Sequence, residues 1–412
     1  MRPLTPPFLA SPSPASLFSK PPSYSRRQLL IAAGATAIAG LAGCAPSQPA
    51  LPSSAAPTVP ERLRLIGEAR LPAALQFQGS AVGGLSGIEF DPASGLYYLL
   101  SDDASSRNPA HFYTLKMTLD AGTLGQPEIT GITQLRQADG SPYASGLLGT
   151  KLLDPESMRW RASSQTFFWT SEGNALAGIA PSLNESRPDG TLLRQFALPA
   201  MFDFAAARGP RSNLTLEGLT LTPDGKTAWI SMEAAMLQDG PVPTPEAPGG
   251  PCRLTQIDVA NGQLLRQIAY LPDAVPRPPR PATAHADNGI SEILMLDAHR
   301  MLVLERAYMA GYDSASSNAL RLYLIDTQQG SNTLDLPALK TGAYTPVQKT
   351  LLADFSAFIG PGAGTRLNRL DNTEGMTWGP VLPNGNRSLL FVSDDNFTAR
   401  QITQFLAFEF LD

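Results

Sequence analysis

Acidic side chains recur through the sequence in a repeated pattern that could bind a divalent cation. Four short apolar segments carry a glutamate at matching positions, 61 to 82 residues apart, and an earlier segment has Ser86 there. These glutamates are Glu156, Glu217, Glu292 and Glu374. Each segment is followed by a β-rich stretch that ends in acid. The acids of this second set are Asp102, Asp103, Glu172, Glu233, Glu305, Asp394 and Asp395.

Carboxylates that a fold brings together raise one another's pKa unless a cation neutralises them. Calcium accepts about six to eight oxygen ligands in irregular geometry, so it suits such a set better than zinc does. We interpret the glutamate set as candidate catalytic residues and the second set as candidate calcium ligands. A structural interpretation remains open, because acids repeated in every unit could equally accept hydrogen bonds from backbone amides of the next unit.

Other chemistry is sparse in this chain. Arg306 is the candidate for binding an anionic substrate, since a guanidinium matches the oxygens of a phosphate. With three histidines and two cysteines, the sequence argues against a multi-histidine metal centre. It also has no glycine-rich phosphate loop and no nucleophile elbow. His285 lies in a proline-rich loop, where we interpret it as a solvated residue, with a general acid as the alternative.

The segments that carry these acids read as strands of a repeated unit. Turn sequences such as 91–95 (Asp-Pro-Ala-Ser-Gly) and 222–226 (Thr-Pro-Asp-Gly-Lys) are typical of hairpins. Further alternating segments, such as 253–257 and 320–324, complete units of four strands. Four-stranded units repeated along a chain predict an all-β fold, a β-propeller. We count five blades, with six as the alternative because the longest spacings have room for extra strands.

The ends of this region predict how the propeller closes. The last unit is one strand short, and residues 62–68 form a strand with no partner nearby in sequence. We therefore expect N- and C-terminal strands to share the closing blade, which removes an exposed sheet edge. The first strand of each blade in a propeller lines the central channel, so the four glutamates should approach one another around its axis.

The first sixty residues predict export and membrane anchoring. Arg26 and Arg27 precede an uncharged stretch, 29–42, that is too short to span a bilayer and resembles a signal sequence. The paired arginines resemble a twin-arginine signal, and the segment ending at Cys44 resembles a lipobox. We expect a signal peptide over 1–43 and a lipidated Cys44 with a proline-rich tether over 44–61. Cleavage by an ordinary signal peptidase and an uncleaved amphipathic start are the alternatives.

The order of the five strand motifs resembles a known family. These motifs are Gly-Leu-Ser-Gly-Ile-Glu (84–89), Asp-Pro-Glu-Ser (154–157), Leu-Glu-Gly-Leu (216–219), Ser-Glu-Ile-Leu (291–294) and Asn-Thr-Glu-Gly-Met (372–376). Their succession is similar to that of the bacterial phytase-like domain family described as "esterase-like activity of phytase", over residues 62–412. The resemblance implies a propeller that hydrolyses phosphoesters or esters, and bound calcium would assist that chemistry.

Two functions from different classes follow from these observations. The first is a calcium-assisted hydrolase of a small anionic phosphate or ester, exported to the periplasm or cell surface and held at the membrane by Cys44. The second is a non-catalytic lipoprotein that binds a ligand or an envelope partner. Residues 1–43 contain no acid, so all 36 acidic residues lie in the remainder, and this acidic body argues against nucleic acid. We expect a monomer.

Overall fold

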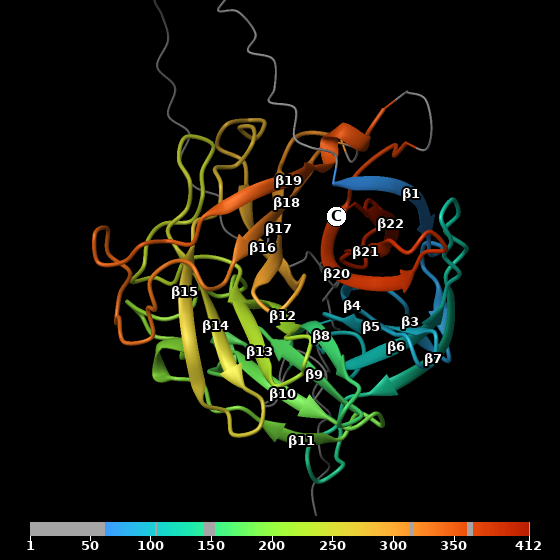
Figure 1. Cartoon of the computed structure of the whole chain (residues 1–412), viewed down its shortest axis with the longest axis horizontal. Coiled ribbons are helices and arrows are strands. Elements are labelled where there is room, and N and C mark those ends of the chain that lie inside the picture. Colours follow the sequence, from blue (N-terminus) through green and yellow to red (C-terminus); the bar gives the residue numbers. More distant parts are fainter. Residues whose placement is uncertain (1–61, 104, 144–152, 314–315, 361–365, 412) are drawn as a thin grey trace, which may run out of the picture. The chain divides into compact units, whose positions relative to one another are not determined.

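The computed structural model describes residues 62–103, 105–143, 153–313, 316–360 and 366–411. The predicted signal peptide, Cys44 and the tether lie outside these residues. Within them the fold is all-β, with five antiparallel four-stranded sheets arranged as a ring, and the prediction of a five-bladed propeller is confirmed (Figure 1). No helix in the described part of the chain is long and apolar enough to cross a membrane.

Each of the first four blades is one sheet whose strands follow in chain order. Blade 1 comprises β4 (Leu85–Asp91), β5 (Leu96–Ser101), β6 (His111–Lys116) and β7 (Glu128–Gln134). Blade 2 comprises β8 (Pro155–Arg161), β9 (Thr166–Ser171), β10 (Ser182–Ser186) and β11 (Leu192–Gln195). Blade 3 comprises β12 (Leu216–Leu221), β13 (Thr227–Met232), β14 (Cys252–Asp258) and β15 (Leu264–Tyr270). Blade 4 comprises β16 (Ala286–Met295), β17 (Arg300–Met309), β18 (Asn318–Asp326) and β19 (Lys349–Asp354).

Blade 5 is built from both ends of the described chain. It comprises β20 (Asn372–Val381), β21 (Arg387–Asp394), β22 (Gln404–Phe410) and the N-terminal strand β1 (Leu63–Arg70). β1 pairs antiparallel with β22 from Leu63 opposite Phe410 to Arg70 opposite Gln404, which confirms the predicted closure (Figure 1). The described residues also include a small hairpin and three 3₁₀ turns. These are β2 (Gln76–Phe77), β3 (Ser80–Ala81), η2 (Ala175–Ala177), η3 (Ala200–Phe202) and η4 (Phe355–Phe358).

Alternating apolar side chains fill the space between neighbouring blades. One cluster packs blade 4 against blade 5 and includes Leu304, Phe391 and Phe408, all fully buried. A second packs blade 5 against blade 1, and others join the remaining pairs of blades. Because each sheet buries both faces against its neighbours, its strands contain few exposed apolar residues. This core holds the blades at fixed positions around the axis.

The innermost strands β4, β8, β12, β16 and β20 contact one another in a closed ring. Glycines in three of them permit this close approach. A Cβ atom on Gly87 would lie 2.9 Å from the carbonyl oxygen of Glu156, and one on Gly375 would lie 2.7 Å from that of Ser86. A Cβ on Gly218 would similarly meet the backbone of β16 at 2.9 Å. The glycines of these three motifs are therefore required by the packing of neighbouring blades.

Candidate functional site

Bulges in the innermost strands place the candidate acids at one end of the channel. In β4, β16 and β20 the pairing skips one residue, which is Ser86, Ser291 and Glu374 respectively. β8 and β12 show the same irregularity around Glu156 and Glu217. A bulge bends a strand and redirects the side chain at that point. The bulge position is thus acidic in three blades and serine in two.

The register of the second strands identifies the matching position beside each bulge. On the second strand of each blade, one residue pairs with the inner-strand residue just before the bulge. From blade 1 to blade 5 this residue is Ser101, Ser171, Met232, Glu305 and Ser393. The next residue in each strand is Asp102, Glu172, Glu233, Arg306 or Asp394, in the same blade order. Four blades therefore present an acid at this position and blade 4 presents an arginine.

Eight carboxylates gather at this end of the channel. In three groups, oxygen atoms of the three members lie within 4.8 Å of one another. The groups are Asp102, Glu374 and Asp394; Asp154, Glu156 and Glu172; and Glu172, Glu217 and Glu233. We call these eight residues the carboxylate ring. Sequence reasoning missed Asp154, although the pair Asp154-Pro155 directly precedes the Glu156 motif and could have indicated it.

Arg306 lies between two of these groups. Its Nη2 atom is 3.4 Å from Oε1 of Glu233 and 3.3 Å from Oε1 of Glu374, and its Nη1 atom is 3.5 Å from Oδ1 of Asp287. The side chain is only 1% exposed. A buried guanidinium surrounded by three carboxylates serves as an internal counter-ion. Its burial does not suit the predicted role of clamping an anionic substrate.

Burial and mutual repulsion perturb the carboxylate ring. The pKa of Glu156 is raised well above its usual value, first by loss of solvent and then by the charges of Glu217, Asp102 and Asp154. Oε2 of Glu374, a side chain 5% exposed, has no hydrogen-bond partner among the described residues. A set of carboxylate oxygens with an unsatisfied member fits a hard divalent cation such as calcium. The donor chemistry therefore fits the expected ion.

Some acids also hold neighbouring blades together, as the structural interpretation expects. Oε1 of Glu172 accepts a 2.7 Å hydrogen bond from the backbone N–H of Thr215, which leads into blade 3. Oδ1 of Asp395 accepts one of 3.0 Å from Gly84 in blade 1. Asp103 accepts backbone hydrogen bonds within its own loop, from residues 106–108. Asp103 and Asp395 thus fix loops rather than join the carboxylate ring.

Glu292 lies one position past the bulge of β16 and occupies a different part of the channel. It accepts hydrogen bonds from Ser157 Oγ (2.7 Å) and the Leu219 amide (2.9 Å), and it pairs with Arg159 Nη2 at 2.8 Å. The motif alignment placed Glu292 with Glu374, but the residue at that position is Ser291. The prediction that all four glutamates converge is therefore wrong for Glu292, because one residue of register changes where a side chain points.

Arg159 crosses the channel axis and was not identified from the sequence. Its Nη1 atom donates to the carbonyl of Ile88 at 3.1 Å, and Nη2 donates to the carbonyls of Ile293 and Met376 at 3.2 and 3.0 Å. It therefore links the inner strands of four blades, since it lies on β8 itself. The sequence gives little signal for it, because β8 also contains Glu156, Ser157 and Arg161.

Glu305 belongs to a separate cluster between blades 3 and 4. Its carboxylate accepts hydrogen bonds from Tyr270 Oη and Lys349 Nζ, both at 2.6 Å, and from Asn288 Nδ2 at 2.8 Å. Lys349 also pairs with Asp273 at 2.7 Å. The pairing of Glu305 with Ile290 places it one residue before Arg306, so its side chain points away from the carboxylate ring. Glu305 is therefore not a calcium ligand candidate at the carboxylate ring.

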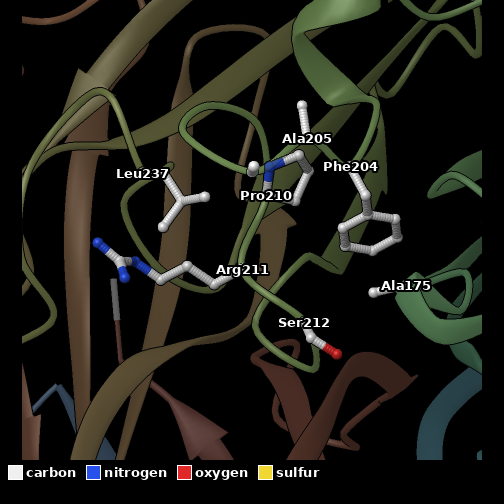
Figure 2. A pocket seen from close by; sticks show the side chains of 8 residues that line it. Ala175, Phe204, Ala205, Pro210, Arg211, Ser212 and Leu237 are labelled. Atoms are coloured by element: carbon white, nitrogen blue, oxygen red, sulfur yellow. The ribbon is translucent and has the colours of Figure 1, made fainter.

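A recess of about 470 Å³ is lined mainly by residues 204–212, which precede β12, with Ala175 and Leu237 from the loops that follow Glu172 and Glu233 (Figure 2). Most of its lining is apolar and includes Ala175, Phe204 and Leu237. Its one guanidinium, Arg211, points away from Phe204 in Figure 2 and donates to the carbonyls of residues 235 and 240. The recess therefore adds apolar surface close in sequence to the carboxylate ring, with its guanidinium already engaged by the backbone.

The sequence matches one family model, described as "Phytase-like: Esterase-like activity of phytase", over residues 80–397. No curated protein matches the sequence. The structure is similar to that of a GH62 α-L-arabinofuranosidase catalytic domain from Coprinopsis cinerea, with 10% identity and a TM-score of 0.42 over 85% of this chain and 98% of that chain. It is also similar to the periplasmic gluconolactonase of Pseudomonas aeruginosa, with 12% identity and a TM-score of 0.33 over 81% of this chain and 87% of that chain. A third similar structure is the hydrazine synthase of Kuenenia stuttgartiensis, with 13% identity and a TM-score of 0.35 over 78% of this chain and 80% of that chain. At these identities and scores, none of the three informs the function of the chain.

Proposed function

Because the chain belongs to the phytase-like family described by "esterase-like activity of phytase", we propose that it hydrolyses phosphoric or carboxylic esters with the help of a calcium ion. The carboxylate ring is the proposed site. The substrate would be a small anionic phosphate or ester that approaches the ring at Asp102 and Asp154, its partly exposed members.

The observation that carries this proposal is the concentration of carboxylates around Glu374. Eight acids gather at the end of the channel, where the buried Arg306 contacts Glu233 and Glu374, so negative charge is concentrated there. Repulsion of this size disfavours the ionised ring, as the raised pKa of Glu156 indicates. A divalent cation would relieve the repulsion and would take up the unpartnered Oε2 of Glu374.

We assign different roles to the residues at the ring. Asp102, Glu374 and Asp394 would hold the cation, and Arg306 would keep Glu374 in place through its 3.3 Å contact. A bound calcium ion would supply Lewis-acid chemistry by polarising the phosphoryl or carbonyl oxygen of the ester. Arg159 closes the channel behind the ring, so the substrate would enter from the ring side.

We also propose that the protein acts outside the cytoplasm, at a membrane. The support is the sequence alone: paired arginines, a short apolar stretch and the lipobox-like segment ending at Cys44. Acyl chains on Cys44, with the tether of residues 44–61, would keep the propeller close to the membrane surface.

A non-catalytic binding protein is the second candidate. It is favoured by the acids that already hold backbone amides, such as Glu172 at Thr215 and Glu292 at Leu219. In this case the acids would stabilise the ring of blades, and the channel face would serve only to bind a ligand. The two candidates differ in whether calcium binds and whether esters are hydrolysed.

Calorimetric titration of calcium into residues 62–412 tests the proposal. We expect saturable binding that weakens at least about tenfold in Glu374→Gln, which removes a charged ligand but keeps the side-chain volume. Glu128→Gln is the matched control, because Glu128 is exposed on the outer strand β7. The same proteins are assayed with p-nitrophenyl phosphate and p-nitrophenyl acetate, with calcium and with a chelator.

Calcium-dependent hydrolysis that falls in Glu374→Gln and persists in Glu128→Gln supports the hydrolase. Calcium binding without turnover of either ester favours the binding protein. No calcium binding, with Glu374→Gln merely less stable, would show that the carboxylate ring is a structural feature and would refute the proposed site.

A further inference from the structure

The hairpin of β16 and β17 extends past the carboxylate ring. At the level of the ring, Gly289 pairs with Arg306, and the pairing continues outward through Asp287 with Tyr308. Asp287 and Gly289 are two residues apart on one strand, so their side-chain positions face the same way. Asp287 therefore lies over Arg306 at the mouth of the channel, and His285 directly precedes β16.

A hydrogen bond and an ion pair connect His285, through Asp287, to the buried Arg306. Nε2 of His285 is 2.9 Å from Oδ2 of Asp287, and Oδ1 of Asp287 accepts the backbone N–H of Tyr308 at 3.1 Å. The same Oδ1 lies 3.5 Å from Nη1 of Arg306. Exposure falls along this series, from 50% for the His285 side chain to 17% for Asp287 and 1% for Arg306. His285 is thus exposed to solvent, as its sequence context indicates, and it also contacts Asp287.

The Asp287 contact determines which nitrogen of His285 is free to react. A carboxylate can only accept a hydrogen bond, so Nε2 carries the proton in the neutral imidazole and Nδ1 keeps its lone pair. Nδ1 has no hydrogen-bond partner among the described residues, and half of the side chain is open to solvent. The Tyr308 ring lies beside the imidazole, at a centroid distance of 6.1 Å. This is the arrangement of a general base held by an acid.

We propose that His285 is the general acid–base of the ester hydrolysis and that Asp287 is its positioning residue. This inference rests on the proposed function, and it adds a reacting group that the carboxylate ring lacks. Asp287 fixes the tautomer and orientation of the imidazole, and Arg306 holds the Asp287 carboxylate from the buried side.

The proposed step transfers one proton twice. Nδ1 of His285 takes a proton from water while the water oxygen forms a bond to the phosphorus or the carbonyl carbon of the ester. The bond to the leaving oxygen then breaks with its electron pair, and the imidazolium returns the proton to that oxygen. The products are an acid and an alcohol, the imidazole is neutral again, and no oxidant or further reactant is consumed.

The test compares His285→Gln, Asp287→Asn and His299→Gln in the whole protein. His299 is the matched control, because it is exposed at the opposite end of the same hairpin. Substrates are the phenyl and p-nitrophenyl esters of acetate and phosphate. We expect His285→Gln to lower kcat for phenyl esters by about 100-fold or more, the usual worth of a general acid–base, with little change in KM. The loss should be smaller for p-nitrophenyl esters, whose leaving group departs without a proton.

An independent measurement is the long-range ¹H–¹⁵N spectrum of the imidazoles, which is simple because the chain has three histidines. We expect the Nε2–H tautomer for His285 in the wild type and its loss in Asp287→Asn. Equal losses on both leaving groups, rates within twofold of wild type, or a His285 protonated at Nδ1 would overturn the assignment while leaving the hydrolase intact. A wild-type protein inactive on all four esters would instead refute the proposed function, and this role with it.

Discussion

The free energy of unfolding should fall as the pH rises toward neutrality, because Glu89 is mostly buried. Replacing Glu89 by glutamine should abolish that fall. Glu89 lies at the end of β4, and its carboxylate accepts hydrogen bonds from the Trp160 amide (3.2 Å) and Thr377 Oγ1 (3.1 Å). Arg159 is 3.6 Å away. Loss of solvent outweighs these favourable contacts and raises the pKa of Glu89 from 4.5 to about 7.

The size of the effect follows from this shift. A carboxyl group with a higher pKa in the folded than in the unfolded state binds more protons when folded, so stability falls as the pH rises from 4.5 to 7. Each pKa unit corresponds to about 1.4 kcal/mol. The 2.5-unit rise of Glu89 therefore costs about 3 kcal/mol, an order-of-magnitude figure for a side chain 14% exposed, reached just above pH 7.

Urea denaturation of wild type and Glu89→Gln at several pH values between 4.5 and 8 would measure this. The difference in unfolding free energy should change by about 3 kcal/mol across the range, in favour of the glutamine variant at high pH. Referring each difference to pH 4.5 cancels the constant cost of altered contacts with Arg159. Glu128→Gln, an exposed control, should show no such trend. A constant difference would mean that the favourable contacts offset the burial cost, and a trend favouring wild type at high pH would mean that they outweigh it.

Two further predictions concern the ring of blades. Gly375→Ala would place a Cβ 2.7 Å from the carbonyl oxygen of Ser86, so we expect a loss of about 2 kcal/mol or more in urea denaturation. Gly131→Ala, whose Cβ would meet nothing closer than 3.5 Å, should be nearly neutral, and equal losses would contradict the close-packing argument. Removing residues 1–70 would delete β1 and expose the edge of β22, so a lower melting temperature and self-association in size-exclusion chromatography are expected. A chain that begins at residue 62 keeps β1 and serves as the control, and identical behaviour of the two would show that β1 does not close the ring.

Buried charges are paired to different extents at the carboxylate ring and at the channel centre. At the centre, both oxygens of Glu292 are engaged by Ser157, Arg159 and the Leu219 amide, so this carboxylate acts as a structural link between blades. At the ring, Arg306 contacts Glu374 at 3.3 Å, and Oε2 of Glu374 has no hydrogen-bond partner in the part of the chain that the structure describes. Buried charge that is fully paired holds a fold together, whereas charge in excess needs a ligand. This contrast is why we place the proposed site at the ring.

The fold was predictable because its signals are local. Alternating strands and hairpin turns recur along the chain, and they indicated an all-β propeller of five blades closed by strands from both ends. The family could also be identified, because its motifs appear in order from residue 84 to residue 376. Acids at matching positions of several repeats further indicated that Glu156, Glu217 and Glu374 belong together.

The membership of the site depended on tertiary structure. Successive side chains of a strand point to opposite sides, so a bulge that shifts the register by one residue exchanges neighbours. This exchange placed Arg306 rather than Glu305 beside the carboxylate ring, and placed Glu292 at the channel centre. The contact between His285 and Asp287 at the mouth of the channel likewise required coordinates, since a two-residue separation in a loop does not predict a hydrogen bond. Sequence thus determined the fold and the supply of acids, while strand register decided which of them meet.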